Sequence, residues 1–178
     1  MPKYVAFLRA INVGGRIVKM DYLRDLFAAL GFANVETLIA SGNVIFSSAS
    51  KNTKGLEQKI EIHLHETLGY KVATFVRSTS ELAAIARYKP FADSELNAEG
   101  HTLYIGFLSA KPVDEAKQKM AAHRTEVDEF HFHGREIYWL CRKKFSETQF
   151  KGNLEKLLGM QATLRNSTTV KKIAVKYS

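Results

Sequence analysis

The segment from Arg9 to Lys19 contains the residues of this chain that are best suited to ligand chemistry. Gly14 and Gly15 lie within it, before a predicted helix, where backbone N–H groups and the helix dipole can bind an anion. Arg9 and Lys19 supply positive charge, and the amide of Asn12 can donate or accept a hydrogen bond. The segment lacks the Gly-Lys-Ser/Thr ending of a P-loop and the Gly-x-Gly-x-x-Gly pattern. It predicts an anion-binding loop, although a glycine pair also serves simply as a turn.

Two further polar segments could contribute to the same kind of site. Ser41, Gly42 and Asn43 separate two apolar runs and predict a tight turn, because glycine and asparagine tolerate a positive φ. Arg165 and Asn166 come directly before the last predicted helix. Asn166 is suited to the N-cap, and Arg165 would then stand beside the positive end of the helix dipole. A simple cap next to a surface arginine is the alternative interpretation.

The other chemistry-bearing residues form no recognisable catalytic or metal-binding set. His131 and His133 lie two apart on a predicted strand and share a face, which we expect to be turned to solvent, and no third metal ligand stands out. Cys141 is the only cysteine, which excludes an intrachain disulfide, and its apolar surroundings predict a buried thiol. No Ser-His-Asp, paired-carboxylate or His-Glu-x-x-His arrangement can be assembled. The sequence therefore identifies no catalytic residue and no cofactor, and it predicts no metal site.

The first half of the chain must position the glycine loop between a strand and a helix. Its apolar pattern predicts the order βαββαβ, which is the ferredoxin-like or split βαβ arrangement. The strands are expected at 3–9, 35–40, 44–47 and 72–76, and the helices at 21–30 and 53–68. Because a helix crosses between the first two strands, these strands run in the same direction and their carboxyl ends share one edge of the sheet. The glycine loop and the turn at 41–43 are therefore expected to meet at that edge.

The second half repeats this order loosely. The pattern predicts a strand at 102–108, a helix from Pro112, a hairpin of 127–133 and 136–141 across Gly134-Arg135, a helix at 150–158 and a final helix after Asn166. The last strand is either missing or reduced to 162–164. We therefore predict an α+β fold of two ferredoxin-like subdomains with antiparallel sheets, with a single continuous sheet as the alternative. The expected division is 1–77, a helix and linker at 78–100, and 101–178.

Composition bounds the class of protein and its partners. Hydrophobic content of 46% and charged content of 25% are ordinary for a globular protein, and no run approaches the roughly 18 apolar residues that span a bilayer. The first residues do not resemble a signal peptide, so a cytoplasmic location and no membrane partner are expected. The net charge of +8 favours anionic partners, meaning a small molecule, a nucleotide or nucleic acid. Because the basic residues are scattered, a merely solvated basic surface is an alternative to a nucleic-acid interface, and the oligomeric state is not specified.

Several of these motifs together resemble the bacterial DUF1697 family. The family's motifs are R-G-I-N-V-G-G, S-G-N-V and R-N-W-N-T-V, and this chain has their counterparts from the first strand to the last helix. The matching positions are Arg9, Ile11, Asn12, Val13, Gly14, Gly15, Ser41, Gly42, Asn43, Arg165, Asn166, Thr169 and Val170. The resemblance implies an α+β fold of two ferredoxin-like subdomains and no established activity. Ala10 replaces the usual glycine, and Ser167-Thr168 replace Trp-Asn, so an aromatic surface and an amide are absent.

The combined features predict a protein that binds a phosphorylated small molecule or a nucleotide. The expected place is the edge formed by the glycine loop and the 41–43 turn, closed from the second half of the chain by the segment before the last helix. The expected ligand-binding residues are Arg9, Asn12, Gly14, Gly15, Lys19, Ser41, Asn43, Arg165 and Asn166. The alternative is a non-catalytic module that binds nucleic acid or another protein.

Overall fold

The structure of the chain is a computed structural model that describes residues 1–11, 17–38 and 42–177. The chain divides into two compact units, and each unit contains one four-stranded sheet. Unit 1 is Met1–Ala83 together with the chain end from Lys176, and unit 2 is Ala84–Val175. Within the described ranges, no helix combines the length and the apolar character needed to cross a membrane.

Unit 1 has the predicted ferredoxin-like order. Its elements are β1 (Lys3–Leu8), α1 (Met20–Ala28), β2 (Ala33–Thr37), β3 (Asn43–Ser47), α2 (Thr53–Leu68) and β4 (Thr74–Ser78). The boundary with unit 2 falls within the next helix, α3 (Thr79–Arg87). The strands are arranged β2-β3-β1-β4, and every neighbouring pair is antiparallel. β1 and β2 therefore point in the same direction with β3 between them, as the helical crossover requires.

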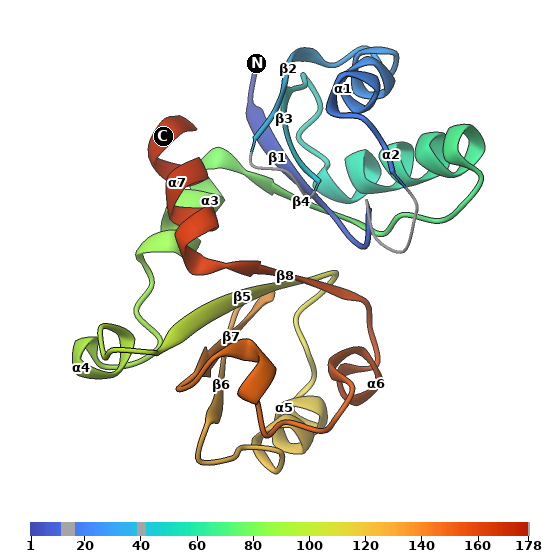
Figure 1. Cartoon of the computed structure of the whole chain (residues 1–178). Helices are drawn as coiled ribbons and strands as arrows, with labels where there is room; N and C mark the ends of the chain where they lie inside the picture. Colours follow the sequence, from blue (N-terminus) through green and yellow to red (C-terminus); the bar gives the residue numbers. More distant parts are fainter. Residues whose placement is uncertain (12–16, 39–41, 178) are drawn as a thin grey trace. The chain divides into compact units, whose positions relative to one another are not determined.

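The core of unit 1 forms between the sheet and its two long helices, which lie on the same side of the sheet (Figure 1). Leu23, Leu26 and Phe27 make the i, i+3, i+4 stripe of α1 and are buried. They pack in one cluster with Ala6 and Leu8 of β1. The side chains of β1 that point to the other face of the sheet are buried as well, which explains the continuously apolar sequence of that strand.

β2 ends at Thr37, earlier than predicted, and β3 begins at Asn43. The turn expected at 41–43 includes Ser41, and residues 39–41 lie outside the described ranges. Two hydrogen bonds between Leu38 and Asn43 close the loop between β2 and β3. The Leu38 N–H donates to the Asn43 carbonyl at 3.1 Å, and Asn43 Nδ2 donates to the Leu38 carbonyl at 3.2 Å. The end of β2 was predicted too late, because an apolar run does not reveal where strand pairing stops.

Unit 2 contains a second, complete ferredoxin-like sheet. Its elements are α4 (Asp93–Leu96), β5 (Thr102–Leu108), α5 (Asp114–Ala121), β6 (Asp128–His133), β7 (Glu136–Cys141), the short 3-10 helix η1 (Phe145–Glu147), α6 (Leu154–Leu158), β8 (Ala162–Asn166) and α7 (Ser167–Tyr177). The strand order is β6-β7-β5-β8, which repeats the order of unit 1. The last strand is neither lost nor short, because β8 pairs with β5 along its length.

Two predicted boundaries in unit 2 were wrong for local reasons. Pro112 does not begin the helix, because α5 starts at Asp114 with Val113 in the N-cap position. The helix expected from Phe150 starts only at Leu154, where Asn153 Oδ1 accepts a hydrogen bond from the Lys156 N–H at 3.1 Å. The polar stretch expected as a linker contains the short helix α4. The buried thiol of Cys141 is confirmed.

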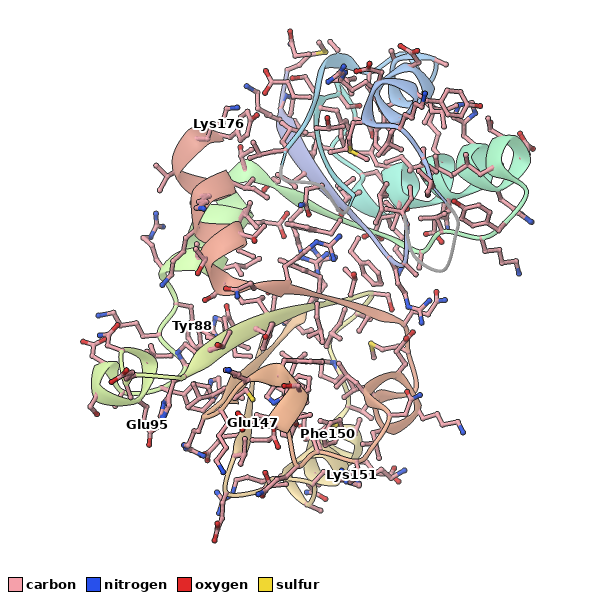
Figure 2. The ribbon with its side chains drawn as sticks, in the orientation of Figure 1. Tyr88, Glu95, Glu147, Phe150, Lys151 and Lys176 are labelled. Atoms are coloured by element: carbon pink, nitrogen blue, oxygen red, sulfur yellow. The ribbon has the colours of Figure 1, made fainter. Side chains whose placement is uncertain are left out.

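A buried carboxylate joins the start of β6 to the segment that follows η1. Asp128 is fully buried, and both of its oxygens accept hydrogen bonds. Oδ1 accepts from Trp139 Nε1 (2.9 Å) and Thr148 Oγ1 (2.6 Å), and Oδ2 from Thr125 Oγ1 (2.8 Å) and the Gln149 N–H (2.9 Å). Thr148 and Gln149 lie between Glu147 and Phe150, which Figure 2 labels. Burial raises the pKa of Asp128, but these hydrogen bonds outweigh it and hold the pKa below its ordinary value.

Candidate functional site

The end of β1 and the start of β3 meet at one edge of the unit 1 sheet, which we call the rim. The Leu8 N–H donates to the Gly42 carbonyl at 2.9 Å, and the Arg9 N–H donates to the Ala73 carbonyl at 2.9 Å. Gly42 lies so close to the β1 exit that a Cβ at this position would stand 2.5 Å from Ile11 Cγ2. The expected meeting of the two loops is therefore confirmed for the described residues.

Four of the predicted ligand-binding residues lie outside the described ranges: Asn12, Gly14, Gly15 and Ser41. The described residues on either side of the glycine loop are anchored in the core of unit 1. Ile11 is 3% exposed and Val18 is 6% exposed, and both belong to the cluster that contains β1, α1 and α2. The ends of the loop are thus held by apolar burial, close to where β1 leaves the sheet.

Lys19 begins helix α1 in an arrangement that favours an anion. It occupies the N-cap position, is exposed, and among the described residues no side chain caps this end of the helix. A cation at the positive end of a helix dipole is unfavourable on its own. A bound anion would offset both the charge of Lys19 and the partial positive charge of the helix end. The nearest carboxylate in the first turn, Asp21, forms an ion pair with Arg24.

Asn43 and Arg9 share the rim but differ in exposure. Asn43 is 2% exposed and pairs with Phe7 in the sheet register, two residues before Arg9. Its side-chain amide holds the loop through Leu38. Arg9 is half-buried at the end of the strand. The geometry thus gives Asn43 a part in shaping the rim, and its predicted contact with a ligand stays a prediction.

Ala10, next to Arg9, adopts a backbone conformation that suits glycine. Its φ is 56°, in the left-handed region, where an L side chain costs roughly 1–2 kcal/mol. The only other described residue apart from glycine with a positive φ is Asn34, a type that tolerates this region. This accounts physically for the glycine found at the Ala10 position in the motif the chain resembles. Strain of this kind often marks functional segments.

Ala10→Gly is therefore expected to stabilise the protein. The substitution relieves the left-handed strain but adds freedom to the unfolded chain, so the expected net gain in the free energy of unfolding is about 0.5–1 kcal/mol. Chemical denaturation measures it. Ala28→Gly on the exposed side of α1 is the control, with an expected loss of about 0.5–1 kcal/mol because glycine weakens a helix. Equal losses in both variants would contradict the strain at Ala10.

The second predicted pair, Arg165 and Asn166, lies at the end of β8 in unit 2. Asn166 Oδ1 accepts a hydrogen bond from the Thr168 N–H at 2.9 Å, which confirms the predicted cap of α7. Arg165 Nη1 donates to Thr163 Oγ1 at 2.8 Å and to the Leu164 carbonyl at 2.9 Å. Burial lowers the pKa of Arg165 to about 10, so the guanidinium stays charged at neutral pH.

Unit 2 also has a pocket that the sequence did not predict, with a volume of about 830 Å³. Asn166 lines it, together with Arg87, Tyr88, His101 and Lys171 from other segments. Arg87 ends α3 and Tyr88 follows it, whereas the other three residues come from the stretch between α4 and β5, from β8 and from α7. No local pattern connects these segments. Only the convergence of separate elements could have revealed this pocket.

The histidine pair on β6 is part of an aromatic cluster. Tyr88 Oη lies 2.6 Å from His131 Nε2, and the Tyr88 ring stacks on His133 with centroids 3.8 Å apart. Burial and the neighbouring His133 lower the pKa of His131. His133 is exposed, as expected for this face, whereas His131 is half-buried. Within the described part of the chain, no group of three or more His, Cys, Asp or Glu side chains is arranged to hold a metal ion.

Comparison with known proteins supports the fold and names no activity. The profile of a family described as "Protein of unknown function (DUF1697)" matches residues 1–138, so Arg165 and Asn166 lie beyond the matched part. The conserved bacterial protein SP0830 from Streptococcus pneumoniae has a similar structure, with a TM-score of 0.81 and 23% sequence identity over 99% of this chain and 98% of that one. At this identity the likeness shows the fold alone. No curated protein matches the chain.

Proposed function

The chain belongs to DUF1697, a family of proteins of unknown function, and we propose that this member binds a phosphorylated small molecule or a nucleotide at the rim of unit 1. The observation that carries the proposal is the packing of Gly42 against Leu8 and Ile11. It places the start of the glycine loop and the end of the β2–β3 loop at one edge of the sheet. The proposal concerns binding and names no reaction.

The charges around the rim suit a phosphate group. Arg9 directly follows β1, the strand that leads into the rim, and Lys19 occupies the uncapped start of α1. A guanidinium can form two parallel hydrogen bonds to phosphate oxygens, and the first N–H groups of a helix point at a bound anion. The net charge of +8 adds long-range attraction for such ligands.

Ligand-induced stabilisation tests this proposal. ATP, glucose 6-phosphate and inorganic phosphate are each titrated while thermal unfolding is followed. A ligand present at 100 times its Kd is expected to stabilise the protein by about 2.7 kcal/mol. Arg9→Ala and Lys19→Ala should each weaken binding about fivefold or more, which corresponds to about 1 kcal/mol.

Lys51→Ala is the matched control for the rim variants. Lys51 is exposed and follows β3, at the edge of the sheet opposite to the rim where that strand begins. Lys51→Ala removes one positive charge, as Lys19→Ala does. It should change the affinity for the phosphate ligand less than about twofold, because exposed charges far from the ligand are screened by salt. The absence of stabilisation by all three compounds, or equal losses in the Lys51 and Lys19 variants, would contradict the proposal.

Nucleic-acid binding is the second candidate, favoured by the net charge and by the basic residues Lys171, Lys172 and Lys176 of α7. It predicts retention on heparin and an affinity for single-stranded RNA that falls steeply with salt. Such binding should persist in Arg9→Ala and Lys19→Ala, whereas the proposed rim site requires both residues.

A further inference from the structure

The pocket in unit 2 has a lining that combines charge and apolar surface. Leu96 and Leu103 contribute apolar surface, and Tyr88, which Figure 2 labels, contributes an aromatic ring. Its volume of about 830 Å³ falls within the range of small-molecule sites. All the lining residues belong to unit 2, so the pocket is complete within that unit.

The charge in this pocket is positive and unbalanced. Arg87, Lys89 and Lys171 line it, and Asp93 is the lone carboxylate of the lining. Asp93 forms an ion pair with Lys89, with a distance of 3.1 Å between Nζ and Oδ1. Arg87 and Lys171 have no ion-pair partner among the residues that the structure describes. Two cations from different helices thus face the same cavity without a carboxylate to balance them.

The polar groups that surround these cations are held in place by the protein. The Tyr138 hydroxyl donates to the Ile85 carbonyl at 3.0 Å, and Tyr88 is hydrogen-bonded to His131 and stacked on His133. His101 Nδ1 donates to the Glu95 carbonyl at 2.7 Å. The start of α7 is already capped by Asn166, so the positive character of the pocket comes from its side chains and not from a free helix end.

We propose that this pocket is a second binding site, for a small organic anion that carries a phosphate group and an apolar body. Arg87 and Lys171 would hold the phosphate, because both line the pocket and a guanidinium and an ammonium group both form charge-assisted hydrogen bonds to phosphate oxygens. Leu96, Leu103 and the edge of Tyr88 would contact the body. The site is separate from the rim of unit 1 and does not depend on the function proposed there.

Calorimetric titration of the full chain with phenyl phosphate and with inorganic phosphate tests this site. We expect phenyl phosphate to bind more tightly, because the apolar lining removes its ring from water. Lys171→Ala should weaken binding of phenyl phosphate about fivefold or more, and Arg87→Ala combined with Lys171→Ala should abolish it. Both side chains are exposed, so the variants should fold, as circular dichroism would show.

Lys172→Ala is the matched control, since Lys172 is exposed on the same helix but does not line the pocket. It should change the affinity less than about twofold, and Arg9→Ala in unit 1 should leave the binding that depends on Lys171 in place. Three results would overturn the assignment. The first is no heat of binding at concentrations up to about 10 mM, which corresponds to a Kd weaker than the millimolar range. The others are an equal loss of affinity in the Lys171 and Lys172 variants, or a complete loss of binding in Arg9→Ala alone.

Discussion

Gly42→Ala is expected to lower the free energy of unfolding by about 2–5 kcal/mol, from left-handed strain of roughly 1–2 kcal/mol and overpacking of roughly 1–3 kcal/mol. Gly42 has a φ of 82°, and an added Cβ would stand 2.5 Å from Ile11 Cγ2 and 3.0 Å from Leu8 Cβ. Both neighbours are buried and part of the core, so neither can move aside easily. Denaturant unfolding followed by circular dichroism measures the loss.

Gly31→Ala separates the two contributions in the same unit. Gly31 has a similar φ of 87°, but an added Cβ would have no neighbour within 4 Å. Its substitution should cost only the left-handed strain of roughly 1–2 kcal/mol. The excess loss in Gly42→Ala then measures the contact between the β2–β3 loop and the β1 exit. Equal losses in the two variants would show that the rim is not packed as described.

The same substitution also bears on the proposed function. If the ligand binds at the rim, Gly42→Ala should weaken phosphate-ligand binding even where the protein is folded, because the added methyl group separates the two loops. Gly31→Ala should retain binding, since Gly31 follows α1 and lies outside the rim. Unchanged affinity in folded Gly42→Ala would argue against the rim as the site.

Asp128→Asn is expected to lower the free energy of unfolding by about 2–4 kcal/mol, because it leaves a buried donor without an acceptor. The two oxygens of Asp128 face the indole N–H of Trp139 on one side and the Gln149 N–H on the other. Neither of these N–H groups can accept a hydrogen bond. Whichever way the new amide is turned, its NH₂ group therefore meets one of them.

The pH dependence of stability gives a second measurement on Asp128. Its pKa is lowered in the folded protein, so the carboxylate contributes stability above the pKa of about 3.9 expected for the unfolded chain, and this contribution is lost as the pH falls through the folded value. The difference in unfolding free energy between wild type and Asp128→Asn should therefore shrink when the pH falls from about 5 to about 2.

Glu99→Gln is the control for this substitution. Glu99 is exposed, and the loss of its charge should change stability by less than about 0.5 kcal/mol. A loss in Asp128→Asn no greater than in this control, or a difference that does not depend on pH, would show that the Asp128 hydrogen bonds do not stabilise unit 2.

Local patterns predicted the elements that depend on local causes. The bounds of β5 and β7 agree with the apolar runs, because β7 is buried along its length and β5 is buried over its last four residues. The helix predicted at 53–68 has the bounds of α2, because Asn52 and Gly69 cap its two ends. The end of β2 and the start of α6 were predicted wrongly, since they depend on hydrogen bonds of Asn43 and Asn153 that no apolar pattern reveals.

The sequence by itself determined the direction of the strands and hence the meeting of two distant loops at the rim. A helical crossover leaves β1 and β2 no other relative direction within one sheet, so chain order suffices. It also marked Ala10 as a departure from a glycine motif. The backbone conformation that explains this glycine appears only in the structure.

Only the tertiary structure decided that β8 completes the second sheet, that donors from β7 and from the segment after η1 meet at Asp128, and that Arg87 and Lys171 share a pocket. Each of these features joins residues far apart in the chain. Their meeting depends on how sheets and helices pack, and neither residue spacing nor periodicity carries that information.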